Sequence, residues 1–260
     1  MTAPLIEYLN VSVQRGGRMA LDSVSLAIAD GEHVAILGPN GSGKSTLIKT
    51  ITRELYPLAR PGSHLRILGR DRWNIFDLRP LLGVVSNDLI QACARHFYTG
   101  REIVLSGFFG SIGIWPNHEV TSGMERMADQ VMEELEIAHL TDRNAEEMSS
   151  GEARRMVIAR ALVHRPKALV LDEPTNSLDF HAMRGLRATM SRIAKGGTGL
   201  ILVTHHLDDI VPEVSRVVLL ESGRVAADGR KESMLTSQRL SALFQTAVEV
   251  EERNGYYRLW

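Results

Sequence analysis

The sequence predicts an α/β fold built on a parallel sheet, with an antiparallel β region near its start and a helical segment in its middle. Three continuous apolar runs in the last third, residues 168–171, 200–203 and 217–220, are separated by helical patterns. Such runs are typical of parallel strands that are covered on both faces. A further apolar run, residues 33–37, leads through a glycine-rich segment into another helical pattern and adds a strand to this sheet.

The first 70 residues also carry the pattern of antiparallel strands. Apolar and polar residues alternate over residues 9–13 and 24–28, on either side of a glycine turn at residues 15–18. Asp30-Gly31 is a turn signal that precedes the strand at residues 33–37. A second short β pattern around residues 65–68 extends this antiparallel region.

The middle of the chain is predicted to be mainly helical. A core strand over residues 81–87 is expected to continue into a loop, and from about residue 92 to 143 apolar residues recur every three or four positions. Within this part, glycines interrupt the aromatic segment Phe108–Pro116 and exclude a continuous helix there. The segment fits a core loop and a docking surface for a partner equally well.

The composition describes a globular chain without a strong charge bias. Hydrophobic residues make up 44% and charged residues 23%, and 30 Lys and Arg against 31 Asp and Glu leave a formal charge of -1. Bulk charge therefore gives no indication of a nucleic-acid partner. No apolar run is long enough to span a membrane, so we expect any membrane part to belong to another polypeptide. The single cysteine, Cys93, is assigned no chemistry.

The glycine-rich segment fits the phosphate-binding pattern G-x-x-x-x-G-K-[ST] and stands between a predicted strand and a predicted helix. It comprises Gly38-Pro39-Asn40-Gly41-Ser42-Gly43-Lys44-Ser45-Thr46. The glycines let backbone N–H groups close on a phosphate chain at the positive end of a helix. We expect Lys44 to reach the β- and γ-phosphates, Ser45 to place its hydroxyl on Mg²⁺, and Thr46 to bond a more distal phosphate oxygen.

Two carboxylates follow the apolar run at residues 168–171. A strand that ends in Asp172 and Glu173 delivers both acids to the mouth of a parallel sheet, where such folds bind ligands. We expect Asp172 to hold Mg²⁺ through its water shell, and Glu173 to polarise the water that attacks the γ-phosphate.

A third segment, Met148-Ser149-Ser150-Gly151-Glu152, precedes a helical pattern at residues 153–163. Its serines and glycine could provide hydroxyls and free N–H groups for an anion, but taken alone they describe an ordinary helix N-cap.

These segments, followed by Ser177-Leu178-Asp179 and Val203-Thr204-His205, stand in the order that resembles the ATP-binding cassette ATPases. The resemblance extends from about Leu5 to the end of the chain. It implies a P-loop NTPase fold with a RecA-like core, an antiparallel β subdomain and an inserted helical subdomain, all within a single domain. We expect core and β subdomain at about 1–91 and 161–260, and the helical subdomain at about 92–160.

The resemblance also implies the roles of particular residues, with ATP and Mg²⁺ as the cofactors. Ser149, Ser150, Gly151 and Glu152 match the family signature, which caps the γ-phosphate bound by a second ATPase subunit in a head-to-tail dimer, here expected to be a homodimer. Asp179 matches the acid at the dimer contact. His205 matches the switch histidine that bonds the γ-phosphate, whereas the adjacent His206 is expected to be a surface residue.

Three positions differ from the family pattern. The adenine-stacking aromatic is replaced by Arg15 or its neighbours, and a guanidinium can also stack on a base. The usual glutamine after the strand at residues 81–85 is replaced by Asn87, whose amide could still bind Mg²⁺, with Gln91 as a weaker candidate. Glu152 stands in place of the last glutamine of the signature.

Two functions fit these features. In the first, the chain is the ATPase subunit of a transporter that imports a metal, an oxyanion or a metal chelate through a separate permease, and lies in the cytoplasm on the inner face of the membrane. The residues after Leu220 favour it through their similarity to metal-chelate importer ATPases. In the second, the chain is a soluble regulatory or repair-associated ATPase without a permease, as the similarity of residues 104–113 to the molybdate-transport and photorepair subgroup suggests.

Overall fold

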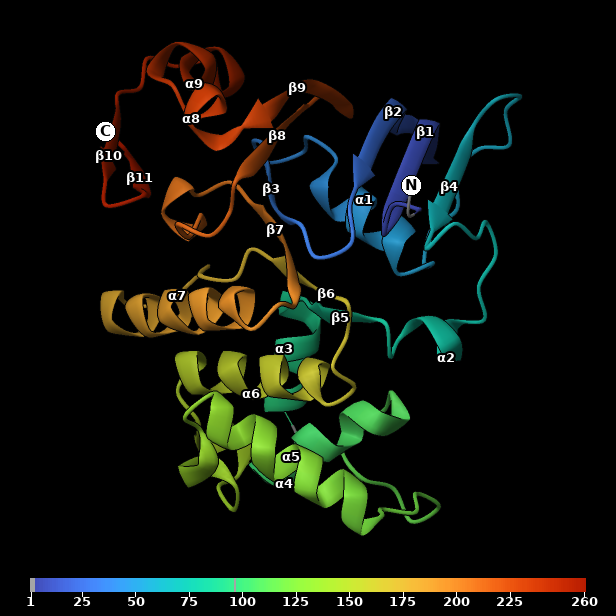
Figure 1. Cartoon of the computed structure of the whole chain (residues 1–260), viewed down its shortest axis with the longest axis vertical. Helices are drawn as coiled ribbons and strands as arrows, with labels where there is room; N and C mark the ends of the chain where they lie inside the picture. Colours follow the sequence, from blue (N-terminus) through green and yellow to red (C-terminus); the bar gives the residue numbers. More distant parts are fainter. Residues whose placement is uncertain (1–2, 96) are drawn as a thin grey trace. The chain divides into compact units, whose positions relative to one another are not determined.

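A computed structural model describes residues 3–95 and 97–260. The chain divides into two compact units, one formed by Met1–Ile75 with Gly199–Trp260 and the other by Phe76–Thr198 (Figure 1). Both units combine helices with paired parallel strands, which confirms the predicted α/β fold. Within the described residues, none of the helices has the length and apolar character that crossing a membrane requires.

The first unit is built around a sheet with the strand order β7-β3-β8-β9. Its strands are β3 (His33–Leu37), β7 (Gly199–Thr204), β8 (Arg216–Glu221) and β9 (Arg224–Arg230). Strand β3 is parallel to β7 and β8, and β9 returns antiparallel to β8. The predicted apolar runs of β3, β7 and β8 are buried. Because these three strands are parallel, the segments that follow them emerge at one edge of the sheet.

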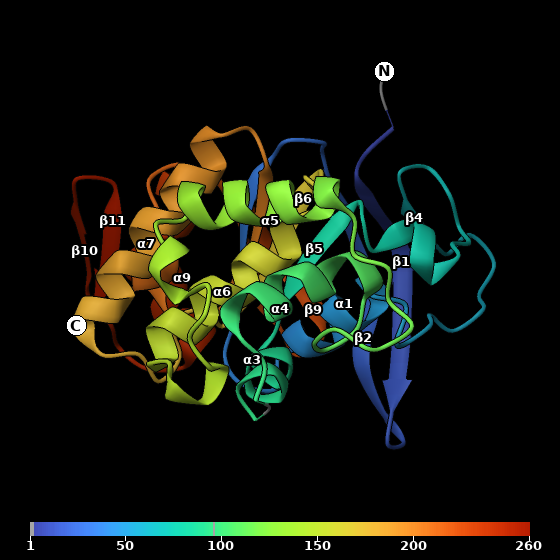
Figure 2. The ribbon, with the colours of Figure 1, turned by 90° about the horizontal axis from the view of Figure 1, so that it is seen from below.

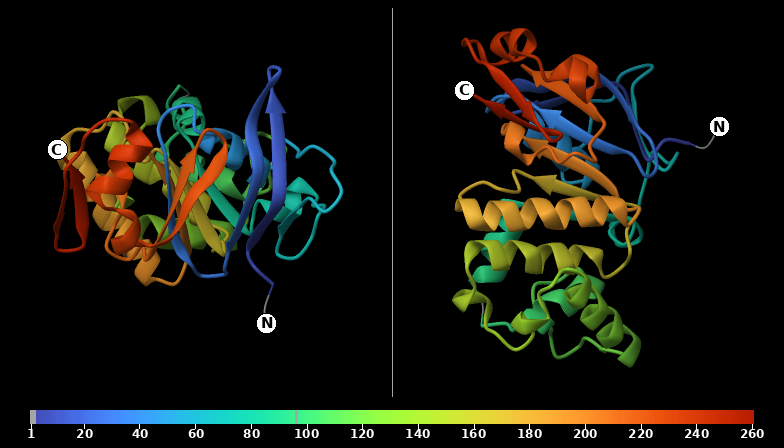
Figure 3. Two further views of the ribbon diagram at one scale, coloured as in Figure 1. Left: turned by 90° about the horizontal axis from the view of Figure 1, so that it is seen from above. Right: turned by 60° about the vertical axis from the view of Figure 1, so that its left-hand side comes forward.

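The predicted antiparallel region is confirmed as a second sheet of this unit, in the order β2-β1-β4 (Figure 3). It contains β1 (Ile6–Arg15), β2 (Arg18–Ile28) and β4 (His64–Ile67). Gly16 and Gly17 form the turn between β1 and β2 with φ of 54° and 78°, a conformation that glycine adopts without strain.

A buried tyrosine joins this sheet to helix α1 (Lys44–Ile51). The hydroxyl of Tyr8 lies 2.7 Å from Oγ1 of Thr50 and donates to the carbonyl of Leu47 over 3.1 Å. Burial raises the pKa of Tyr8 far above its ordinary value, so the hydroxyl stays protonated and keeps its donor. The contact fixes the helix that follows the glycine-rich segment.

The end of the chain packs on the segment after β7. It comprises α8 (Lys231–Met234), α9 (Ser237–Phe244) and the hairpin of β10 (Val250–Arg253) and β11 (Tyr256–Leu259), while η4 (Leu207–Asp209) follows β7. Arg258 Nε lies 3.2 Å from Asp208 Oδ1, and buried Lys231 donates to the carbonyl of Pro212 over 3.0 Å. The first contact holds the hairpin against η4, and the second holds α8 to the segment after η4.

The second unit consists of a parallel strand pair and a group of helices (Figure 2). The strands are β5 (Leu82–Val85) and β6 (Ala168–Asp172). The helices are α3 (Asn87–Ala94), α4 (Gly100–Leu105), η1 (Ser106–Phe109), α5 (Ser122–Glu134), η2 (Ala138–Leu140), η3 (Ala145–Glu147), α6 (Ser150–Leu162) and α7 (Phe180–Lys195). The short helix α2 (Ile75–Leu78) lies where the first unit passes into the second.

One local prediction for this unit is wrong. The strand at residues 81–87 ends at Val85, and the loop expected after it is helix α3, because Ser86 caps that helix by accepting from the N–H of Leu89. Asn87 is therefore the first residue of a helix. The boundaries expected for the helical subdomain stay a prediction.

The aromatic segment Phe108–Pro116 is not helical beyond Phe109, as its glycines indicate, and Gly110 and Gly113 have positive φ. The ring of Phe109 stacks on His118 at 4.1 Å between centroids, and His118 stacks on Trp115 at 5.6 Å. Trp115 remains 51% exposed, so the segment combines partial burial with an exposed aromatic surface.

Candidate functional site

The glycine-rich segment Gly38–Thr46 lies at the carboxyl end of β3, and its last three residues begin α1. Gly41 and Gly43 have φ of 80° and 109°, which L side chains rarely adopt. A Cβ at Gly38 would lie 2.2 Å from the carbonyl oxygen of Leu220, closer than any side chain permits. The loop conformation therefore depends on glycine at these three positions.

Gly223, in the turn between β8 and β9, supports the loop from outside the motif. Its N–H donates to the carbonyl of Ser42 and its carbonyl accepts from the N–H of Asp22, both over 2.8 Å. A Cβ at Gly223 would lie 2.8 Å from the carbonyl oxygen of Ala20, and a Cβ at Gly43 would lie 2.7 Å from the same oxygen. One carbonyl of β2 thus crowds two glycines that are far apart in the sequence.

The polar groups of the loop fit a phosphate chain. The Nζ atom of Lys44 donates to the carbonyls of Gly38 and Pro39 over 2.6 and 3.1 Å, so the ammonium group is folded back over the loop. Ser42 is 2% exposed, and its Oγ has no hydrogen-bond partner within the described residues. A buried hydroxyl without a partner costs free energy that a phosphate oxygen would recover. Ser45 is exposed in the first turn of α1, where its hydroxyl is accessible.

The two acids of the second motif lie where the sequence predicts, at the end of β6. Asp172 is the last residue of the strand, and Glu173 follows with a φ of 48°, a left-handed conformation that strains a residue with a side chain. Such strain persists where the surrounding structure enforces it, and it is common at functional sites.

The enforcing residue is Arg154 of α6, which the sequence analysis did not identify. Its guanidinium donates to the carbonyls of Glu173 over 3.0 Å and Asn176 over 2.7 Å, and also to that of Pro174. It further donates to Oδ1 of Asn87 over 2.9 Å. Arg154 therefore brings together α6, the segment after the catalytic candidate Glu173, and the predicted Mg²⁺ ligand Asn87, whose amide oxygen keeps a second acceptor site.

A helical pattern could have revealed Arg154. It lies three residues after Gly151 and four before Ile158, on the face of α6 that is buried. An arginine on a buried helix face requires acceptors, and the carbonyls after β6 supply them.

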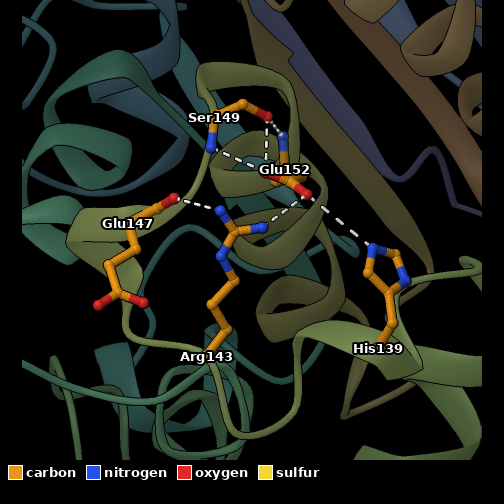
Figure 4. Close-up of polar contacts among 5 residues, drawn as sticks. All are labelled: His139, Arg143, Glu147, Ser149 and Glu152. Carbon is orange, nitrogen blue, oxygen red and sulfur yellow. Dashed lines mark hydrogen bonds and ion pairs between the residues drawn. The ribbon is translucent and has the colours of Figure 1, made fainter.

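The signature segment begins helix α6 with reciprocal caps (Figure 4). The N–H of Glu152 donates to Oγ of Ser149, while Oε2 of Glu152 accepts from the N–H and the hydroxyl of Ser149 over 2.8 and 2.7 Å. Partial burial raises the pKa of Glu152, but the bonds from Ser149 and the charges of Arg143 and His139 outweigh it, and the pKa lies below its ordinary value. Glu152 is therefore a carboxylate at neutral pH.

The same end of α6 packs on the start of α7. A Cβ at Gly151 would lie 2.8 Å from Cβ of Ala182, so this signature position has room only for glycine. Asp179 caps α7 by accepting from the N–H of Ala182 over 2.8 Å. The predicted signature and the predicted dimer-contact acid thus lie together, with Ser149, Ser150 and Asp179 all exposed.

His205 and His206 follow β7 in the first unit. Thr204 Oγ1 accepts from the N–H of His206 over 3.0 Å and lies 2.5 Å from Oδ2 of Asp209, and both Thr204 and Asp209 are fully buried. This pair shapes the turn that presents His205, which is half-buried. His206 is exposed, as predicted. Arg15, the proposed base-stacking residue, is exposed beside the turn of the β1–β2 hairpin.

Comparison with known proteins agrees with this set of features. Residues 21–176 match the family model described as ABC transporter. The ABC transporter ATP-binding protein YlmA of Bacillus subtilis is 33% identical over 253 residues, which cover 95% of this chain and 93% of that protein. The hemin import ATP-binding protein HmuV of Rhizobium meliloti is 34% identical over 257 residues, with coverage of 95% and 93%.

A solved structure is similar over nearly the whole chain. That of cbiO1 from Clostridium perfringens, part of the ABC transporter complex cbiONQ, has a TM-score of 0.77 and 27% identity, and the match covers 92% of this chain and 94% of that one. The family model spans more than half of the chain, and the two relatives share about a third of their residues with it over nearly its whole length. The chain therefore belongs to the ABC transporter family, as one of its ATP-binding, ATP-hydrolysing proteins.

Proposed function

We propose that this chain is the ATPase subunit of an importer, that it acts as a pair of identical subunits on a separate membrane permease, and that the solute is a metal, an oxyanion or a metal chelate. The solute class rests on the relatives, since HmuV is a hemin import protein. The permease is supported by cbiO1, which is part of a transporter complex.

The observation that carries the proposal is the exposed start of α6. Ser149 and Ser150 lie at a capped helix N-terminus with their side chains exposed to solvent. A helix N-terminus attracts phosphate, yet this one belongs to a segment separate from the phosphate loop. The N-terminus of α6 can bind phosphate when a second copy of the chain brings its own bound nucleotide next to this helix, as the family signature implies.

The proposed mechanism assigns each group one task. The loop N–H groups and Lys44 hold the β- and γ-phosphates, and Glu173 accepts a proton from the attacking water. His205 donates a hydrogen bond to the γ-phosphate. Mg²⁺ would neutralise phosphate charge, and the resemblance to the family assigns its ligands to the Ser45 hydroxyl and the Asp172 carboxylate. ATP binding closes the dimer and hydrolysis opens it.

The second unit offers a surface for the permease. Three of its exposed aromatic residues, Phe76, Phe97 and Trp115, are 67%, 80% and 51% accessible, respectively. Exposed aromatic side chains of this size are typical of interaction surfaces. We propose that the segment Phe108–Pro116, through the exposed Trp115, contacts the permease on the inner face of the membrane.

The test uses a Glu173→Gln variant that binds ATP without hydrolysing it. With ATP and Mg²⁺ it is added to detergent-solubilised membranes and, separately, to cytosol of the source cell, and bound proteins are identified. We expect a multi-spanning membrane protein to be recovered. Lys44→Ala/Glu173→Gln, which lacks the lysine contact to ATP, is the matched control, and Trp115→Ala/Glu173→Gln tests the docking segment.

Recovery of a multi-spanning protein with Glu173→Gln but not with the Trp115 variant would support both the permease and its docking segment. Recovery of soluble proteins alone, or of a second copy alone, would overturn the importer and favour the regulatory or repair-associated ATPase.

A further inference from the structure

The signature segment contains a carboxylate, Glu152, whose negative charge would repel the phosphate that the segment is proposed to bind. The Glu152 side chain is only 18% exposed, and one of its oxygens, Oε2, is occupied by the two bonds from Ser149. Because Glu152 is a carboxylate at neutral pH, a negative charge lies within hydrogen-bond distance of the hydroxyl that the proposed dimer presents to a polyphosphate. Like charges at such short range oppose binding.

The hydroxyl of Ser149 is also committed within the chain. Its single proton is donated to Oε2 of Glu152 over 2.7 Å, and a carboxylate is a strong acceptor. The same proton must be given to a phosphate oxygen if Ser149 is to cap the nucleotide of the second subunit. A glutamine at position 152 would accept more weakly and carry no charge, so the carboxylate needs a compensating group.

Arg143 supplies that compensation. Its Nη1 lies 3.3 Å from Oε1 of Glu152, the oxygen that Ser149 does not use (Figure 4). Its Nη2 donates to the carbonyl of Glu147 over 2.7 Å, which fixes the guanidinium beside the start of α6. His139, a residue of η2, lies on the other side of the carboxylate, and its Nε2 is 3.9 Å from the same oxygen (Figure 4).

We propose that Arg143 is a positioning residue for the signature segment: it neutralises the Glu152 carboxylate and holds its Oε1, so that the serine hydroxyl and the first N–H groups of α6 can receive the terminal phosphate held by the second subunit. This inference rests on the proposed head-to-tail dimer. It does not depend on a permease or on the solute.

A double-mutant cycle tests the proposal on the full-length chain in solution, with the wild type, Arg143→Met, Glu152→Gln and the double variant. We expect Arg143→Met to lower kcat by about fivefold, as expected for loss of a half-exposed charge pair, with KM for ATP unchanged because Arg143 lies outside the phosphate loop. In the Glu152→Gln background the same substitution should change kcat by less than about twofold, because no charge remains to be neutralised.

Two further variants separate charge from structure. Arg143→Lys keeps the positive charge and should retain most of the turnover. Arg165→Met removes a matched ion pair of the same unit, in which Arg165 lies 2.6 Å from Glu134, and should leave kcat unchanged. ATP-driven dimerisation, measured by sedimentation in the Glu173→Gln background, should weaken with Arg143→Met and recover in the variant that also carries Glu152→Gln.

The proposal is overturned if Arg143→Met lowers kcat equally with Glu152 and with Gln at position 152, since Arg143 would then act through the carbonyl of Glu147. It is also overturned if Arg143→Met leaves turnover and dimerisation unchanged. Failure to find a permease would overturn the proposed importer function. It would not affect the double-mutant cycle, because every measurement in that cycle uses the purified chain alone.

Discussion

Nη2 of Arg154 lies 2.9 Å from Oδ1 of Asn87 and 2.7 Å from the carbonyl oxygen of Asn176. One nitrogen therefore joins the first turn of α3 to the segment that follows β6. Both partners accept from a guanidinium on α6, the helix that begins with the signature. The backbone around Glu173 and the amide of Asn87 are thus positioned by the same buried side chain.

Removal of this guanidinium is expected to weaken both stability and turnover. Arg154→Met would remove the guanidinium donor from the carbonyls of Glu173, Pro174 and Asn176, which should cost about 3 kcal/mol in the free energy of unfolding. Urea unfolding measures this loss, with Arg155→Met on the same helix as the control. A change below about 0.5 kcal/mol would contradict the structural role assigned to Arg154.

Glu173→Gln should preserve nucleotide binding and nearly abolish hydrolysis. Glutamine keeps the size of the side chain but cannot accept the proton of the attacking water, which should lower kcat by about 10²- to 10⁴-fold. Phosphate release measures turnover and calorimetry measures affinity, with the exposed Glu119→Gln as control. Hydrolysis at the wild-type rate would show that another group is the base.

Lys44→Ala should weaken nucleotide binding. The variant removes a charge-assisted contact to the phosphates, and we expect the dissociation constant for ATP to rise by about 10- to 100-fold. Lys49→Ala, one turn further along α1, is the matched control because it changes the net charge equally. An unchanged dissociation constant by calorimetry would refute the role of Lys44.

Acid should remove a small stabilising contribution of Glu152. Its pKa lies below the ordinary value of 4.5 in the folded chain, so the contribution is complete above that value and is lost as the pH falls through the lower folded-state value. Between about pH 6 and about pH 3, the free energy of unfolding of the wild type should therefore fall relative to that of Glu152→Gln, by less than about 1 kcal/mol. Urea unfolding across this range checks it, with the exposed Glu146→Gln as control. A constant difference would indicate that the charge of Glu152 does not stabilise the fold.

Much of the site could be predicted because its chemistry is local in sequence. Gly38–Thr46 specifies a turn, a helix start and a cation within nine residues, and Asp172 and Glu173 directly follow an apolar run. The strands β3, β6, β7 and β8 were recognisable because both faces of each are buried, which leaves continuous apolar runs.

The rest depends on contacts that sequence spacing does not encode. The helix α3 was missed because Ser86 acts as a cap only when the chain turns after β5, and the preceding apolar run indicated a longer strand. The position of Arg154 on a buried helix face indicates that it needs acceptors, but three of them are backbone carbonyls, which every residue has, so the sequence does not identify the partners. The role of Arg143 could not be predicted, because its contact with Glu152 depends on the conformation of the loop between η2 and η3.

The carbonyl of Ala20 has a consequence for how this protein tolerates mutation. Since Gly43 and Gly223 both approach that single oxygen, a methyl group at either position meets the same obstacle. In a genetic selection that depends on the protein, substitutions at Gly223 should therefore be lost as completely as those at Gly43, although Gly223 belongs to none of the nucleotide-binding motifs. If Gly223→Ala survives the selection and Gly43→Ala does not, β2 can shift to make room for a methyl group at position 223. A scan restricted to motif residues would overlook this position, so a harmful variant there would be misread as neutral.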